Sequence, residues 1–192
     1  MLIAVRFTHY VALSVLFGAA LFPLYARQPP DPAQAPVVGL PGRWLVVIAW
    51  GALLTTLGWF SATVGEMSGD PAAGLSPAVL WSVVRDMEFG RLAVAQVALS
   101  LLAIGLAKGF RRPAALALVS GLLLASLAGT GHARLDTGTL GAWPIFAGAL
   151  HLLAAGAWIG GLVALAAVMG RLRRAAGLME RAALGRILRR FS

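Results

Sequence analysis

The chain has 192 residues, of which 59% are hydrophobic and 12% are charged, and its formal net charge is +9. This balance excludes an ordinary soluble domain and is typical of an integral membrane protein. The sequence contains no cysteine, which excludes disulfides, thiolate metal sites and cysteine nucleophiles. Because the lysines and arginines lie at the ends of apolar segments, the positive charge follows membrane topology, and we expect no nucleic-acid partner.

Five apolar segments are long enough, or nearly long enough, to cross about 30 Å of hydrocarbon at about 1.5 Å of helix per residue. The sequence therefore predicts an all-α fold, a polytopic membrane bundle of about five transmembrane helices. The first segment resembles a signal peptide in length, but Arg6 is its only charge before the apolar run, and we expect a retained helix. The predicted helices cover residues 3–25, 44–65, 90–107, 113–130 and 142–169.

The charges between these segments predict an orientation. The strongly basic loop at 108–113 belongs in the cytoplasm by the positive-inside rule, and the basic tail at 171–190 lies two crossings away on the same side. Alternation then places the proline-rich loop at 28–42 inside, and places the N-terminus and the loops at 67–88 and 132–141 outside. Five of the seven acidic residues fall on the outer side, which agrees with this orientation.

Two of the connecting segments have patterns of their own. The outer loop has a turn at 69–71 and then a short apolar piece at 77–84, which we expect along the membrane surface. In the tail, apolar residues recur at helical spacing from Leu172 onward with arginines between them, as in a helix resting on anionic lipid. The sequence therefore predicts a transmembrane helix bundle at 1–170 and a basic amphipathic cytoplasmic helix at 171–192, with membrane lipid as a partner.

His151 lies inside the last apolar segment, and an ionisable side chain within the membrane is a candidate functional site. Trp158 follows seven residues later, so the two side chains lie on nearly the same helix face. Gly156 and Gly160 form a small-xxx-small pair for close helix approach. We expect His151 to be a buried ligand, and the alternative is a packed helix in which it only bonds a neighbour's carbonyl. The residues one turn away leave room for a helix or an ion: Ala147, Gly148, Ala154 and Ala155.

The predicted outer side collects all three histidines and two methionines. Imidazole and thioether together suit Cu(I), and imidazole with carboxylate also serves Cu(II). The carboxyl-terminal ends of the second and fourth helices point outward, and their partial negative charge favours cations there. No two histidines are closely spaced, each methionine alone is typical of packing, and Glu66, Asp86 and Glu88 are typical of solvated loop charges.

Several motifs resemble the CopD family of bacterial copper-resistance membrane proteins, in its N-terminal five-helix portion. They are HLLAAGAWIGGL at 151–162, GHA at 131–133, MSG at 67–69, EFGRL at 88–92 and RRFS at 189–192. The resemblance runs from the second helix to the last residue. It implies a multi-pass protein of the bacterial inner membrane that imports copper from the periplasm, with a CopC-type periplasmic carrier as a partner. The copper ligands that it implies are His132 and His151, followed by Met67 and then by His9, Met87 and Glu66.

Three functions remain open at this point. In the first, copper is captured by His132 and Met67, passed to His151 and released inward. In the second, the chain is a membrane b-type haem protein whose axial ligands are His151 and either His9 or His132. In the third, the histidines only bridge helices of an assembly or sensor subunit. The sequence has no hydrolase triad, phosphate loop or intramembrane carboxylate pair, so we expect no enzyme except through a haem.

Overall fold

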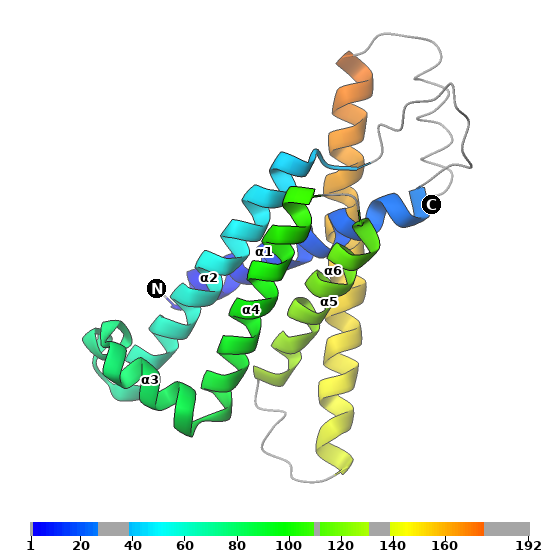
Figure 1. Ribbon diagram of the computed structural model, residues 1–192. Coiled ribbons are helices and arrows are strands. Elements are labelled where there is room, and N and C mark those ends of the chain that lie inside the picture. The colour runs from blue at the N-terminus through cyan, green and yellow to red at the C-terminus, as the bar shows by residue number, and fades with distance from the viewer. Residues whose placement is uncertain (1, 27–38, 110–111, 131–138, 175–192) are drawn as a thin grey trace.

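The computed structural model describes residues 2–26, 39–109, 112–130 and 139–174. Apart from the short connections between helices, these residues are helical (Figure 1). No strand occurs among these residues, which confirms the predicted all-α class. The helices, in chain order, are α1 (Leu2–Ala26), α2 (Gly42–Ser68), the 3-10 helix η1 (Pro71–Leu75), α3 (Pro77–Asp86), α4 (Glu88–Gly109), α5 (Pro113–Ser126), the 3-10 helix η2 (Leu127–Thr130) and α6 (Thr139–Arg174).

Each of the five predicted apolar segments is helical. Four helices, α1, α2, α4 and α6, are long and apolar enough to cross a membrane, whereas α5 and η2 together form a shorter apolar helix over Pro113–Gly129. Four of the five helices predicted to span the membrane thus have the length and hydropathy that a crossing requires. Helix α6 runs through position 170 to Arg174, and the rest of the predicted amphipathic helix at 171–192 lies outside the described residues.

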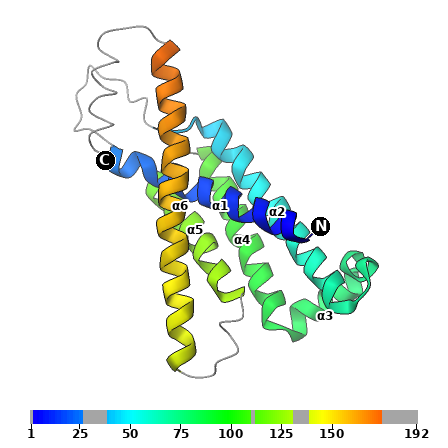
Figure 2. The same cartoon turned by 180° about the vertical axis from the view of Figure 1, so that it is seen from behind.

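Helix α1 lies in the middle of the bundle, with α6 on one side and α2, α4 and α5 on the other (Figures 1 and 2). It runs obliquely across its neighbours, so that its first part packs against α2 and its later part against α5 and α6. Helix α4 lies between α2 and α5 and packs against both. We call α1, α2, α4 and α5 the four-helix ring, because each packs against the next: α1 against α2, α2 against α4, α4 against α5, and α5 against α1.

Glycines set the distance between α1 and α6. Gly18 of α1 lies against Gly156 and Gly160 of α6, backbone to backbone. A Cβ atom on Gly160 would lie 2.5 Å from the carbonyl oxygen of Ser14 and 2.7 Å from the Cα atom of Gly18, which is too close for any side chain. The small-xxx-small pair predicted from the sequence is therefore confirmed, and it determines which face of α6 turns toward the bundle.

The two ends of the bundle differ in charge. Helices α2 and α5 begin, and α4 and α6 end, at one end (Figure 1), which we call the basic end. There the guanidinium of Arg171 donates a hydrogen bond to the carbonyl oxygen of Gly39, tying α6 to the segment before α2. The opposite end, where α2 ends and α4 begins, is called the acidic end. The basic end carries Arg43, Lys108, Arg112 and Arg171. The acidic end carries four carboxylates, Glu66, Asp70, Asp86 and Glu88, against two arginines, Arg85 and Arg91.

The turn predicted after α2 is present, and the short apolar piece that follows it is helical. Gly69 ends α2 in the left-handed conformation, with φ of 67°, and the carboxylate of Asp70 accepts a hydrogen bond from the backbone N–H of Ala72. The hydroxyl of Ser61 donates to the carbonyl oxygen of Gly74 at 2.6 Å and fastens η1 to α2. Helix α3 then covers the predicted apolar piece at 77–84 and leads directly into α4.

Candidate functional site

In the part of the chain that the structure describes, the buried polar side chains belong to helices of the four-helix ring, and one of them, Ser14, lies where α1 meets Gly156 and Gly160 of α6. All of them lie on α1, α2, α4 or α5, and α6 contributes none. A polar group inside a membrane bundle is costly unless it has a partner or a function, so this interior is where a site is expected. The set consists of His9, Ser14, Thr56, Gln96, Ser100 and Ser120.

His9 is the ionisable member of this set, and its side chain is completely buried. It lies on α1 and faces α2, where Thr55 and Trp59 occupy the same face one helical turn apart. The Nδ1 atom of His9 is 2.9 Å from the hydroxyl oxygen of Thr55, and its ring centroid is 5.7 Å from that of Trp59. The Nε2 atom is buried and has no hydrogen-bond partner.

The hydrogen bonds of Thr55 determine where the imidazole proton lies. The Thr55 hydroxyl oxygen is 2.8 Å from the carbonyl oxygen of Gly51 and 3.0 Å from that of Ala52, so its single proton is donated to its own helix. Its oxygen therefore accepts the Nδ1–H of His9. A proton on Nε2 would be a second, unpaired donor and a buried charge, which makes the neutral imidazole the stable form. Nε2 thus carries a free lone pair, the arrangement found in metal-binding histidines.

Aromatic side chains separate His9 from the acidic end. Trp59 touches the His9 ring, and on its other side it meets Phe89 edge to face, with ring centroids 6.0 Å apart. Phe89 also contacts Phe60 at 5.6 Å and lies in the first turn of α4. A group that approaches His9 from the acidic end therefore has to pass these rings.

The residues expected from the sequence to supply sulfur and carboxylate ligands lie at the acidic end and are open to the surroundings. Met67 is near the end of α2, Met87 joins α3 to α4, and their exposed fractions are 56% and 41%. Glu66 is also exposed. Within the described residues, no three His, Asp or Glu side chains come close enough together to hold a metal ion. His132 lies outside the described residues.

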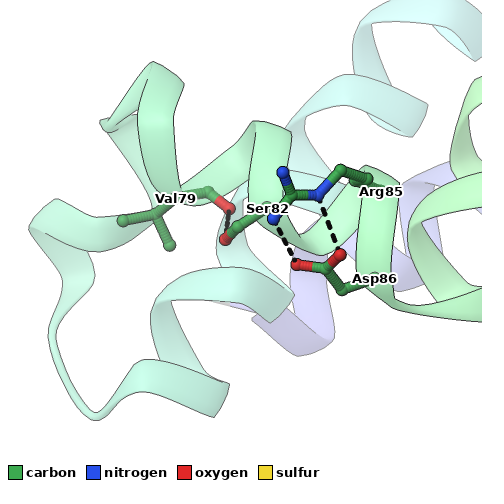
Figure 3. A network of polar contacts seen from close by, with 4 residues as sticks. All are labelled: Val79, Ser82, Arg85 and Asp86. Atoms are coloured by element: carbon green, nitrogen blue, oxygen red, sulfur yellow. Dashed lines mark hydrogen bonds and ion pairs between the residues drawn. The ribbon is translucent and has the colours of Figure 1, made fainter.

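Asp86, at the same end, forms an ion pair with Arg85, the residue before it. Figure 3 shows Arg85 binding both carboxylate oxygens, through Nε at 2.9 Å and Nη2 at 3.2 Å, while Ser82 donates to the carbonyl oxygen of Val79 within α3. The hydrogen bond from Arg85 lowers the pKa of Asp86, and the same bond raises the pKa of Arg85. The pair is exposed and electrically neutral, so Asp86 offers little charge to a cation at this end.

His151 lies on the side of α6 that turns away from the bundle, so the expectation that it is buried is wrong. Nine positions separate it from Gly160, which at about 100° per residue places the two on opposite helix faces. Since Gly160 has to face α1, His151 has to face outward. Trp158 is 65% exposed on the same face, which confirms the predicted alignment of these two residues.

The described helices do not bring His9 and His151 together. His9 is buried against α2, whereas His151 is exposed on α6, so the structure does not pair these two as axial ligands of one haem. The other predicted pair, His132 with His151, includes a residue outside the described part of the chain.

Sequence reasoning gave His9 a low rank and missed its neighbours. Thr55 and Trp59 are ordinary residues of an apolar segment, and nothing local to them indicates a histidine more than 40 positions away. Gln96 did carry a signal that was not used, because an amide in the middle of the predicted 90–107 helix is as unusual in hydrocarbon as an imidazole. The structure buries it and pairs its Nε2 with the hydroxyl of Ser126 at 2.8 Å.

Comparison with known proteins places the chain among copper-resistance proteins. The family model for copper resistance protein D-like N-terminal domains matches residues 1–142. Copper resistance protein D of Pseudomonas syringae pv. tomato is 35% identical over 175 residues, which are 87% of this chain and 55% of that protein. The inner membrane protein YebZ of Escherichia coli (strain K12) is 27% identical over 168 residues, 84% of this chain and 55% of that protein. No solved structure matches the chain.

The match covers the residues that build the interior of the bundle. The family model includes the whole four-helix ring, and thus His9, Thr55 and Trp59, although it ends before the 151–162 motif. The chain spans about half the length of the curated relatives that it matches. The four helices that are long and apolar enough to cross a membrane agree with a membrane location. With 142 of its 192 residues matched, the chain belongs to the copper resistance protein D-like family.

Proposed function

We propose that this chain transports copper across the bacterial inner membrane, from the periplasm to the cytoplasm, and that His9 is its ligand inside the four-helix ring. The observation that carries the proposal is the buried Nε2 atom of His9, which has no hydrogen-bond partner while Nδ1 of the same ring is bonded to Thr55. Imidazole nitrogen is a ligand for copper in both oxidation states. The family relationship supports copper as the ion that this nitrogen receives.

Copper enters from the acidic end in this proposal. Met67, Met87 and Glu66 are exposed there, so an ion delivered by a soluble periplasmic carrier of the CopC type meets accessible sulfur and oxygen ligands first. Their acidic surroundings attract cations, and thioether prefers Cu(I). His132, assigned to the same side by the sequence, joins this entry layer. The ion then passes Trp59 and Phe89 to reach His9.

The remaining candidates take secondary places. His151 acts as a ligand only together with groups outside the described helices, because none of these helices faces it. The arginines of the basic end rest on anionic lipid headgroups of the cytoplasmic leaflet, each contributing about 1 kcal/mol. The chain moves copper without changing it chemically, so it is a transporter and not an enzyme.

The first test is an elemental and optical analysis of the purified full chain, followed by copper uptake into vesicles that contain it. We expect copper bound in stoichiometric amount, no Soret band, and uptake above that of empty vesicles. Purified protein that contains no copper and gives no copper uptake would overturn the proposal. A Soret band would instead support the haem function.

A change at Thr55 tests the way in which His9 is held. Thr55→Val keeps the shape of the side chain but removes the acceptor of the Nδ1–H, so the imidazole is free to turn and the wrong tautomer becomes accessible. Loss of such a partner lowers metal affinity by about 10–100-fold. We expect this loss in a copper competition titration, and we expect Thr55→Ser to restore wild-type affinity.

Thr56→Val is the matched control for this prediction. Thr56 is the neighbouring buried threonine, and its hydroxyl donates to Ala52 within α2 at 2.8 Å without touching His9. Its copper affinity should equal that of the wild type. Equal affinities in Thr55→Val and Thr56→Val would show that the hydrogen bond to His9 has no part in copper binding.

A further inference from the structure

One face of α6 has no neighbour among the described helices. Helix α6 packs against α1 and α5 through the face that carries Gly156 and Gly160. The opposite face is exposed, and Figure 2 shows the molecule from that side, with α6 in front of the other helices. Residues spaced by three or four positions form this face, which we call the outward face of α6: Ala147, His151, Ala154, Trp158 and Leu162.

The outward face carries an imidazole at a depth where hydrocarbon surrounds the bundle. His151 lies within Trp143–Arg171, the part of α6 that is long and apolar enough to cross a membrane. At about 1.5 Å per residue, it is about 12 Å along the helix from Trp143 and about 30 Å from Arg171. Ionisable side chains at such depths almost always face a protein interior and pair with one another or with the backbone. An imidazole that faces lipid leaves its N–H unpaired, so we expect another protein segment to cover this face.

No other part of the 192-residue sequence is suited to cover the outward face. The described helices pack on the other side of α6. A segment that lies along α6 across the membrane needs about 20 apolar residues. The longer segments outside the described residues have 12, 8 and 18 residues and contain charged side chains, and they are 27–38, 131–138 and 175–192. The cover therefore comes from outside this sequence.

The composition of the outward face suits a second copy of the same chain. Helix α6 carries no charge between Thr139 and Gly170, so two copies can meet there without like charges opposing each other. Both copies insert with their basic ends on the same side of the membrane, and a two-fold axis along the membrane normal then brings residues of equal depth together. His151 meets His151 of the second copy. A neutral imidazole has one donor and one acceptor, so the two rings can bond to each other.

We propose that the outward face of α6 is the interface between two copies of this chain, in which the two His151 side chains hydrogen-bond across the two-fold axis. Ala147 and Ala154 lie one turn on either side of His151, and their small side chains let the two helices approach closely. Trp158, which is 65% exposed, then packs against the second copy. The proposal does not rest on copper transport or on His9, which faces α2.

The first test measures the mass of the purified full chain by sedimentation equilibrium in density-matched detergent. We expect the wild type to associate to twice its polypeptide mass of 19.9 kDa. His151→Leu removes the hydrogen bond at similar volume and should raise the dissociation constant about 3- to 30-fold. His151→Asn keeps a donor and an acceptor and should associate more tightly than His151→Leu. A wild type that stays monomeric would overturn the interface, and equal dissociation constants for wild type and His151→Leu would overturn the histidine pair.

The second test locates the interface in vesicles, and it uses the absence of cysteine from the sequence. Ala154→Cys places one thiol on the outward face, and Ala98→Cys is the matched control on α4. Both alanines are exposed, and they lie at similar depth, eleven residues after Trp143 and ten after Glu88. With a short thiol-specific cross-linker at a low protein-to-lipid ratio, we expect covalent dimers of Ala154→Cys only. Equal cross-linking of both variants would indicate random collision and overturn the interface. No cross-linking of Ala154→Cys would also overturn it, because lipid or a different polypeptide then covers the face.

A change in bulk tests the close approach of the two helices. Ala154→Leu should raise the dissociation constant about tenfold, because the larger side chain overpacks the interface. Ala98→Leu adds the same bulk on α4 and should associate as the wild type does. Equal effects of the two variants would contradict an interface on α6. Circular dichroism establishes that both variants are folded.

The proposed interface and the proposed function fail in different ways. None of these measurements contains copper. A chain that dimerises through α6 but neither binds nor takes up copper would overturn the proposed function and leave the interface. A monomeric chain that takes up copper would overturn the interface alone.

Discussion

Replacement of His9 by alanine is expected to remove copper from the purified protein and to reduce uptake into vesicles to background. His9 is the imidazole that the structure places inside the four-helix ring, and its Nε2 has no other partner. Loss of a hydrogen bond to a ligand weakens metal binding about 10–100-fold, so loss of the ligand itself should exceed that range. Copper content by elemental analysis and uptake by a luminal copper indicator measure the two effects.

His151→Ala is the control, because it removes the same side chain from a position that faces away from every described helix. Copper bound within the ring should be unaffected. His9→Gln distinguishes chemistry from packing, since it fills part of the same space without an imidazole, and it should behave as His9→Ala does. Full copper binding by the His9 variants, or its loss only in His151→Ala, would refute His9 as the internal ligand.

The second large effect is expected on stability, from Gly160→Ala. The added methyl group would lie 2.5 Å from the carbonyl oxygen of Ser14, a backbone atom that cannot turn aside. Forcing α1 and α6 apart should lower the free energy of unfolding by roughly 1–3 kcal/mol, the usual cost of overpacking. Thermal unfolding in detergent, followed by tryptophan fluorescence, measures this loss.

Gly105→Ala provides the comparison, because a Cβ atom there has no neighbour within 4 Å. Alanine favours helix over glycine by up to about 1 kcal/mol, so this variant should be as stable as the wild type or more so. If Gly160→Ala unfolds at the same temperature as Gly105→Ala, the α1–α6 crossing is not closely packed in the membrane. Loss of stability in both variants would point instead to a general effect of glycine replacement.

The helices could be predicted from the sequence because hydrocarbon leaves the backbone few alternatives. Each long apolar segment has to satisfy its own N–H and C=O groups, and an α-helix does so within one segment. The turn at Gly69 and the short helix after it were equally readable, since glycine and proline restrict the backbone locally. Only α5 is shorter than predicted, because the last four residues of the predicted 113–130 helix form the 3-10 helix η2.

The orientation of α6 could not be predicted from its sequence. Helix geometry placed His151 and Trp158 on one face, and small residues lined both that face and the opposite one. Either face could then have been the buried one. The choice depends on Gly18, a residue more than 130 positions earlier, against which Gly160 packs. Contacts of this range leave no mark in a local pattern.

The buried site was hidden for the same reason. His9 lies near the start of the chain, and its significance depends on Thr55 from another helix. The sequence predicted a place for it in the outer part of the membrane but could not show that one ring nitrogen would be bonded and the other left without a partner. Chemistry of this kind appears only when two helices are docked in register.

The central position of α1 has a consequence for biosynthesis. Helix α1 is made first, and it can form a hairpin with α2 as soon as both are inserted, which gives His9 its hydrogen bond early. Its other side, around Gly18, waits for α6, the last of the described helices to leave the ribosome. Until then this glycine face is exposed to lipid or to an insertion factor. The bundle is therefore completed around α1, the helix that is made first. If synthesis stops before α6, the Gly18 face of α1 stays unpacked.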